Sequence, residues 1–159
     1  MVSNILDELP RADDNLRLQY QLAAEAKVHR AYAYLTLINI YASHYNEATA
    51  SNDIGVPLIE NPVELPSLER SSVKKVYDFI LDDLLSSVDD LPDDVSRQFV
   101  HRPTKTAAYA ILARTYLYMG DYEKAVLYAD KSLAINSFLY DYNTIYTGNA
   151  SSDNLIGLS

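Results

Sequence analysis

The chain has 159 residues, no cysteine and a formal net charge of −9 at pH 7, from 13 basic and 22 acidic side chains. This length suits one domain with its own core, and the lack of cysteine excludes disulfides and thiolate metal sites. Because nucleic acid and anionic lipid are bound by clustered Lys and Arg, the acidic balance argues against both partners.

The first residues, 1–4, contain neither the basic segment nor the apolar core of a secretory signal. No run of about 18 apolar residues occurs, so no membrane-spanning helix is expected. The abrupt start is typical of a segment taken from a longer protein, in which residues 4–9 form the end of a helix that Pro10 stops.

A long helix is predicted over residues 16–45. Its second half, 31–42, is apolar on almost every side, and its polar residues fall on a narrow stripe with Glu25 and His29. A helix with so little polar surface packs against neighbours on two sides or more, so a central position is expected. The spacing of Glu25 and His29 also predicts an ion pair between them.

The next segment, 46–70, is predicted to be a long inter-helix loop. It contains three Pro and one Gly among polar residues, which forbids a long helix. Within it the apolar residues 55–58 are expected to pack against the helices. Loops of this length in a compact domain are usually functional or disordered.

Residues 72–91 predict an amphipathic helix, because apolar residues recur at positions i, i+3, i+4 and i+7. Ser71 or Ser72 is expected to cap its start, and Pro92 to end it. The polar residues expected on its outer face are Asp82, Asp83, Ser86 and Ser87.

Two further helices are predicted at 104–119, capped by Thr104, and at 121–136, with Gly120 forming the turn between them. The tail, 137–159, has no helical period and is expected to be irregular, apart from a short helix at 140–146. The paired helices carry the small and large residues of one tetratricopeptide (TPR) repeat, namely Tyr109, Leu112, Ala113, Tyr116, Gly120, Ala125, Leu133 and Ile135.

The earlier helix pair, 16–45 and 72–91, is predicted to have the same antiparallel arrangement, with the loop 46–70 in place of a tight turn. The sequence therefore predicts an all-α fold of TPR-like antiparallel helical hairpins, forming an α–α superhelix, within one domain that covers residues 1–159.

Four sequence blocks resemble the SusD/RagB family of glycan-binding proteins. They are EAKVHRAYAY at 25–34, GVPL at 55–58, RSSVKKVYDFI at 70–80 and PTKTAAYAILARTYL at 103–117. Their order is that of the family, and the resemblance covers about residues 3–146. Lys75 departs from it, since the family has an acidic residue there.

The resemblance implies a non-catalytic role in nutrient uptake. A full-length member is a surface-exposed outer-membrane lipoprotein that captures oligosaccharides and delivers them to a TonB-dependent transporter of the SusC type. Family members are several times longer and begin with a lipoprotein signal and a Cys, neither of which this chain has. The chain is therefore interpreted as the scaffold segment, and no sugar-binding residue is carried over.

No catalytic, cofactor or metal site is predicted. Two S-x-x-K motifs, beginning at Ser71 and Ser72, match a penicillin-recognising nucleophile, but neither S-D-N nor K-T-G follows, and capping explains the serines better. No pair of carboxylates has the pattern of a glycosidase. The residue types that metals prefer, but without ligand spacing, occur at Asp89, Asp90, Asp93, Asp94, Asp141, His29, His44 and His101.

Some charged and aromatic residues admit two interpretations. Arg30, Lys105 and Arg114 are expected to be structural, through pairs with Asp or helix-end carbonyls. Tyr41, His44 and Tyr45 at the mouth of the loop offer a weaker hypothesis of sugar stacking, because no tryptophan accompanies them.

An alternative function is a free-standing TPR adaptor that binds a peptide or protein. The long Pro-containing loop argues against it, since adaptor repeats join their helices tightly. With only two helix pairs, apolar faces near Tyr116, Leu117 and residues 31–42 are expected to stay open and to cause self-association.

Overall fold

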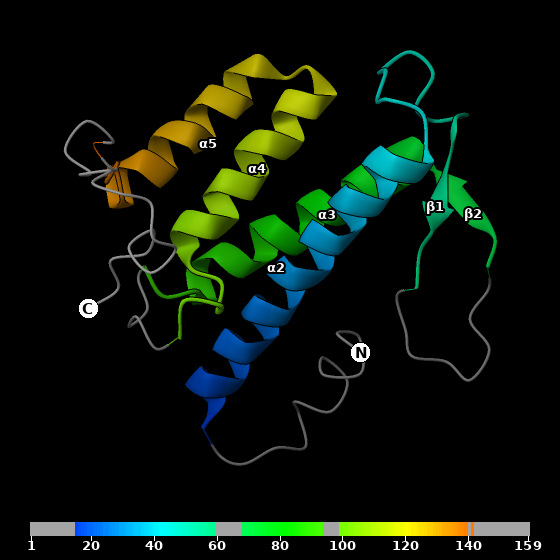
Figure 1. The fold of residues 1–159 in the computed structure, drawn as a ribbon. Helices are drawn as coiled ribbons and strands as arrows, with labels where there is room; N and C mark the ends of the chain where they lie inside the picture. Colours follow the sequence, from blue (N-terminus) through cyan, green and yellow to red (C-terminus); the bar gives the residue numbers. More distant parts are fainter. Residues whose placement is uncertain (1–14, 60–67, 94–98, 140, 142–159) are drawn as a thin grey trace, which may run out of the picture.

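The computed structural model describes residues 15–59, 68–93, 99–139 and 141. They form the helices α2 (Leu16–Tyr41), α3 (Val73–Ser87), η2 (Val88–Asp90, a 3-10 helix), α4 (Lys105–Met119) and α5 (Tyr122–Ile135), and the strands β1 (Ile54–Pro57) and β2 (Arg70–Ser72). Helix α2 lies along α3, and α4 lies along α5 (Figure 1). The predicted all-α fold of helical hairpins is confirmed.

The helix boundaries follow local capping. Ser72 accepts a hydrogen bond from the Lys75 amide at 3.3 Å, and Thr104 accepts one from the Ala107 amide at 3.2 Å, as predicted for both caps. The long first helix ends at Tyr41 rather than at residue 45. The expectations for residues 4–9 and 142–159 lie outside the described residues.

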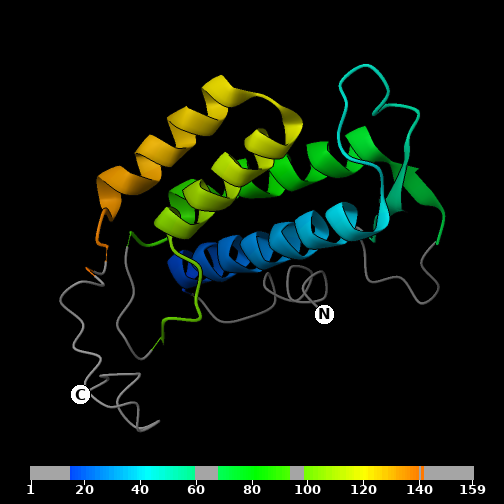
Figure 2. The ribbon, with the colours of Figure 1, turned by 45° about the horizontal axis from the view of Figure 1, so that its top comes forward.

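The segment predicted as a loop contains a small antiparallel sheet, which the sequence did not indicate. Strand β1 pairs with β2 through Ile54 opposite Ser72 and Pro57 opposite Arg70. Gly55 permits this close pairing, because a Cβ on it would lie 2.8 Å from the Ser71 carbonyl oxygen. The sheet lies at the carboxyl end of α2 (Figures 1 and 2). Val56 is buried, so the apolar segment does pack against the helices as expected.

The core lies between α2, α3 and α4. Its fully buried side chains include Ile38, Val76, Ile80 and Leu112. Helix α2 is less enclosed than its composition predicts, because Ile40 is 64 % exposed. Thus α2 has one buried face and one apolar face that no described residue covers.

The turn between α4 and α5 depends on Gly120, which has a φ of 79°. That left-handed conformation lets the Gly120 amide donate to the Leu117 carbonyl and the Asp121 amide to the Tyr116 carbonyl. Asp121 then caps α5 by accepting from the Lys124 amide at 3.1 Å. The predicted turn is confirmed.

A buried ion pair joins α2 to α3. Arg30 Nε donates to Asp83 Oδ2 at 2.8 Å, and Arg30 NH2 donates to Asp83 Oδ1 at 2.7 Å. The Arg30 side chain also lies over the Phe79 ring, 4.8 Å from its centre. The expectation that Asp83 and Ser87 face outward is wrong, because both are buried. Asp83 is paired with Arg30, and the Ser87 hydroxyl donates to the Leu84 carbonyl. The structural role expected for Arg30 is confirmed.

No helix within the described ranges is both long and apolar enough to cross a lipid bilayer.

Replacing Asp83 with Ala is expected to destabilise the protein by about 3–5 kcal/mol, because it leaves the Arg30 charge buried and uncompensated. Urea unfolding followed by circular dichroism measures the loss. The matched control is Asp78→Ala on the same helix, which removes the exposed pair with Lys74 and should change stability far less. Equal losses in the two variants would contradict the role given to Asp83.

Tyr77 is expected to make the free energy of unfolding fall as the pH rises in the alkaline range. Burial raises its pKa to about 12, partly opposed by a hydrogen bond from Asn39, whereas an unfolded tyrosine titrates near about 10. The stabilisation is therefore complete below pH about 10 and is lost as the pH rises through about 12.

Between pH 8 and pH 11 the loss of stabilisation from Tyr77 lowers the free energy of unfolding by about 1 kcal/mol. Tyr77→Phe has no such ionisation, so its free energy of unfolding should fall by that much less than that of the parent. Tyr41→Phe, at a residue 64 % exposed, is the control and should behave as the parent does. An identical pH dependence in all three proteins would refute the assignment.

Candidate functional site

A groove of about 600 Å³ lies where the end of α2 meets the small sheet. Its walls are formed by Tyr34, Leu37, Tyr41, Val56, Pro57, Ile59, Leu68 and Arg70. Apart from Arg70 and two tyrosine hydroxyls, these side chains are apolar. Residues 31–42 and 55–58 are unusually apolar, which is a partial signal of this groove in the sequence.

Two polar side chains of this groove, Arg70 and Tyr34, are engaged with the backbone. Arg70 Nε donates to the Gly55 carbonyl at 2.6 Å, and its NH2 donates to the Tyr41 carbonyl at 2.8 Å. The Tyr34 hydroxyl accepts from the Ile59 amide at 2.8 Å. Arg70 thereby fastens the end of α2 to β1. What remains on the walls suits contact with an apolar surface better than hydrogen bonding to sugar hydroxyls.

The three residues of the sugar-stacking hypothesis are separated by the structure. Tyr41 lines the groove and is 64 % exposed. Tyr45 instead packs edge-on against the Tyr77 ring, with 4.9 Å between ring centres. His44 is exposed and is not among the residues that line the groove. They therefore do not form one aromatic platform.

A second ion pair fixes the connector before α4 to α2. Arg102 donates to both carboxylate oxygens of Glu25, at 2.9 and 2.7 Å, and Gln21 donates to Glu25 Oε1 at 2.9 Å. The hydrogen bonds to Glu25 raise the pKa of the Arg102 guanidinium. The ion pair predicted between Glu25 and His29 is wrong, because Glu25 is buried and faces the connector while His29 is exposed.

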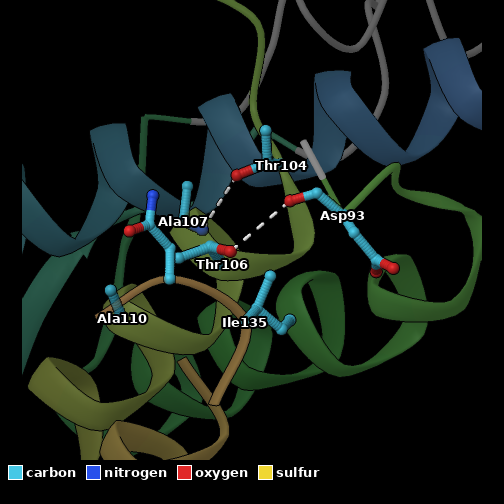
Figure 3. Close-up of a pocket in the computed structure, with 7 residues that line it drawn as sticks. Asp93, Thr104, Thr106, Ala107, Ala110 and Ile135 are labelled. Atoms are coloured by element: carbon cyan, nitrogen blue, oxygen red, sulfur yellow. Dashed lines mark hydrogen bonds between the residues drawn. The ribbon is translucent and has the colours of Figure 1, made fainter. Parts of the chain in front are cut away.

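A smaller pocket of about 250 Å³ separates the start of α4 from the end of α5. Figure 3 shows the Thr106 hydroxyl pointing to the Asp93 carbonyl, a contact of 3.5 Å, beside the Thr104 cap. Lys105 Nζ lies 3.2 Å from the Asp93 carboxylate, so Lys105 holds the connector in place. These contacts give the pocket a structural explanation.

Between α4 and α5 lies a stack of tyrosine rings. Tyr116 and Tyr128 are parallel with centres 5.4 Å apart, and Tyr109 follows at 6.0 Å from Tyr128. Lys124 lies 5.1 Å from the centre of the Tyr116 ring, and Lys131 lies 4.8 Å from that of Tyr128. These rings and the cations beside them serve in packing between the two helices.

The remaining candidate residues assemble no site. Among the residues that the structure describes, no three His, Cys, Asp or Glu side chains gather as metal ligands do. Asp94, part of the acidic cluster, lies outside that set. Arg114 forms no ion pair with any described residue and lines a groove between α2 and α4 instead, so the structural pairing expected for it is not found.

Comparison with known proteins decides the family. A SusD-like family model, described as starch-binding and associating with the outer membrane, matches residues 1–117. The chain belongs to the SusD-like family. No curated protein matches this chain.

Several solved SusD-like structures are similar to this chain. A laminarin-binding SusD-like protein is 27 % identical with a TM-score of 0.71, over 83 % of this chain and 27 % of its own. A SusD superfamily protein from Bacteroides vulgatus is 27 % identical with a TM-score of 0.77, over 87 % of this chain and 32 % of its own. A SusD superfamily protein from Bacteroides thetaiotaomicron is 25 % identical with a TM-score of 0.77, over 89 % of this chain and 32 % of its own. The chain thus spans about a third or less of their length.

The family and the fold agree in detail. The blocks that resembled SusD/RagB proteins coincide with the contacts that hold this structure together: Arg30 with Asp83, the Gly55 approach, the Ser72 cap and the Thr104 cap. The motifs that identify the family in this chain are therefore motifs of packing and capping.

Proposed function

We propose that this chain is the non-catalytic helical scaffold of a glycan-capture protein that works with a TonB-dependent transporter of the SusC type. We further propose that the protein is a lipoprotein on the outside of the outer membrane. The family match over residues 1–117 carries this proposal. A laminarin-binding protein of 27 % identity supports an oligosaccharide as the captured nutrient.

The mechanism is rigid placement. Buried contacts at Arg30 and Asp83 fix the angle between α2 and α3, and the pair of Arg102 with Glu25 fixes the second hairpin to the first. A scaffold held in this way keeps attached segments in a constant geometry beside a transporter. The apolar groove near Tyr41 leaves surface available for such segments.

The test compares this chain with a longer protein that contains it and that has the full length of the SusD-like relatives. The longer protein is expected to bind laminarin or starch at least about tenfold more tightly than the chain alone, which corresponds to at least about 1.4 kcal/mol. It should also co-purify with a TonB-dependent transporter from detergent-solubilised outer membranes. A longer protein that binds no polysaccharide and recovers no transporter would defeat the proposal.

The exposed apolar residues also support self-association of the chain by itself. Leu117, Tyr122, Val126 and Leu133 lie along the α4–α5 hairpin and are 53–67 % exposed. On α2, Ile40 and Tyr41 are exposed as well. Tyr116, expected to contribute, does not, since it is buried in the tyrosine stack.

Light scattering at about 100 µM should therefore detect species larger than a monomer, because exposed apolar patches associate in that range. The variant Val126→Glu with Leu133→Glu should shift the population toward monomer. Both side chains are exposed, so the fold should be retained. The matched control is Ser43→Glu, which adds the same charge at an exposed polar residue in the segment after α2. A strictly monomeric parent would overturn the proposal.

A further inference from the structure

A shallow groove between α2 and α4 has a different chemical character from the apolar groove. It is about 190 Å³ in volume and is lined by Tyr32, Leu35, Thr36, Asn39, Ile40, Arg114 and Tyr118. The α2 residues are spaced along one face of that helix, and the α4 residues 114 and 118 are one turn apart. Two aromatic rings and three hydrogen-bonding side chains thus converge between helices distant in sequence.

Among the residues that the structure describes, Arg114 is the only cation that lines this groove. The other arginines of the central frame are occupied: Arg30 and Arg102 by carboxylates, and Arg70 by carbonyl oxygens. Arg114 has no carboxylate partner among the described residues, although the chain carries 22 acidic side chains. No acidic side chain of the described ranges lines the groove, so an anion entering it meets a guanidinium with no described carboxylate beside it.

The neighbouring polar groups are held in position. The Thr36 hydroxyl donates to the Tyr32 carbonyl at 2.9 Å, and Asn39 Nδ2 donates to the Leu35 carbonyl at 2.7 Å. The Thr36 oxygen therefore presents its lone pairs as acceptors. The Tyr32 ring is 48 % exposed, which leaves part of an aromatic surface beside Arg114.

We infer that the α2–α4 groove binds the acidic residue of an oligosaccharide, a uronate whose carboxylate pairs with Arg114 while its ring lies against Tyr32. The guanidinium offers two parallel N–H donors to a carboxylate, and the hydroxyl acceptors suit sugar hydroxyl groups. The small volume suits one sugar residue of a longer chain. This inference rests on the proposed function, because it names an acidic class of glycan for the same protein.

The test is calorimetric and NMR titration of the 159-residue chain with trigalacturonate and with its methyl ester, which has the same ring and no charge. Trigalacturonate should bind, and more weakly at higher salt, while the ester should bind about tenfold more weakly. Arg114→Gln should lose about tenfold in affinity for trigalacturonate, and Arg114→Lys should lose part of it, since Lys keeps the charge without the fork. Arg17→Gln, at an exposed arginine outside the groove, should bind as the parent does.

Each contrary outcome is informative. Equal affinities for acid and ester, or an unchanged Arg114→Gln variant, would overturn the inference while leaving glycan capture by a longer protein intact. Binding of an acidic peptide in preference to trigalacturonate, abolished by Arg114→Gln, would overturn the saccharide assignment and favour a peptide adaptor. Absence of binding to either sugar at millimolar concentration would also refute it.

Discussion

The pairing of Arg30 with Asp83 is the constraint on which the other contacts depend. It sits between α2 and α3, where the Asp83 side chain is 3 % exposed and the Arg30 side chain 13 %. Isolated charges are costly in such a place, so the bidentate geometry and the Phe79 ring beneath the cation are necessary for the helices to approach. Once α2 and α3 are fixed, α4 can pack its Leu112 against them, and α5 can pack on α4.

Sequence reasoning recovered the elements whose signals are local. Helical period, the Ser72 and Thr104 caps and the Gly120 turn each depend on a few adjacent residues, and all were predicted. It failed where a distant partner decided the outcome. Asp83 reads as an outer-face residue because its cation lies 53 positions earlier, and Glu25 reads as a partner of His29 because Arg102 lies 77 positions later. The β1–β2 sheet was missed for a different reason: its strands are four and three residues long, too short for an alternating pattern.

The surfaces of this chain also divide by chemistry. The groove beside the small sheet is mostly apolar, and its Arg70 and Tyr34 side chains are bonded to backbone. The α2–α4 groove keeps a guanidinium and part of a tyrosine ring accessible. Neither groove was assigned from the sequence. Arg114 and Tyr32, for example, line one groove only because α2 and α4 lie together in the fold. The SusD-like blocks contribute residues to both surfaces, such as Tyr32 and Arg114 to the α2–α4 groove and Val56 and Arg70 to the apolar groove.

The unequal connections within the two hairpins affect the order in which contacts can form. Helices α4 and α5 are joined by Gly120 and Asp121 alone, whereas residues 42–72, or 31 residues, separate α2 from α3. Closing the longer connection costs about 2 kcal/mol more in chain entropy, since the cost grows with the logarithm of loop length. The α4–α5 hairpin can therefore form from local contacts, while the α2–α3 hairpin depends on long-range ones. The β1–β2 pairing shortens that connection: by bringing Ile54 opposite Ser72, it reduces the free loop that α2 and α3 must close.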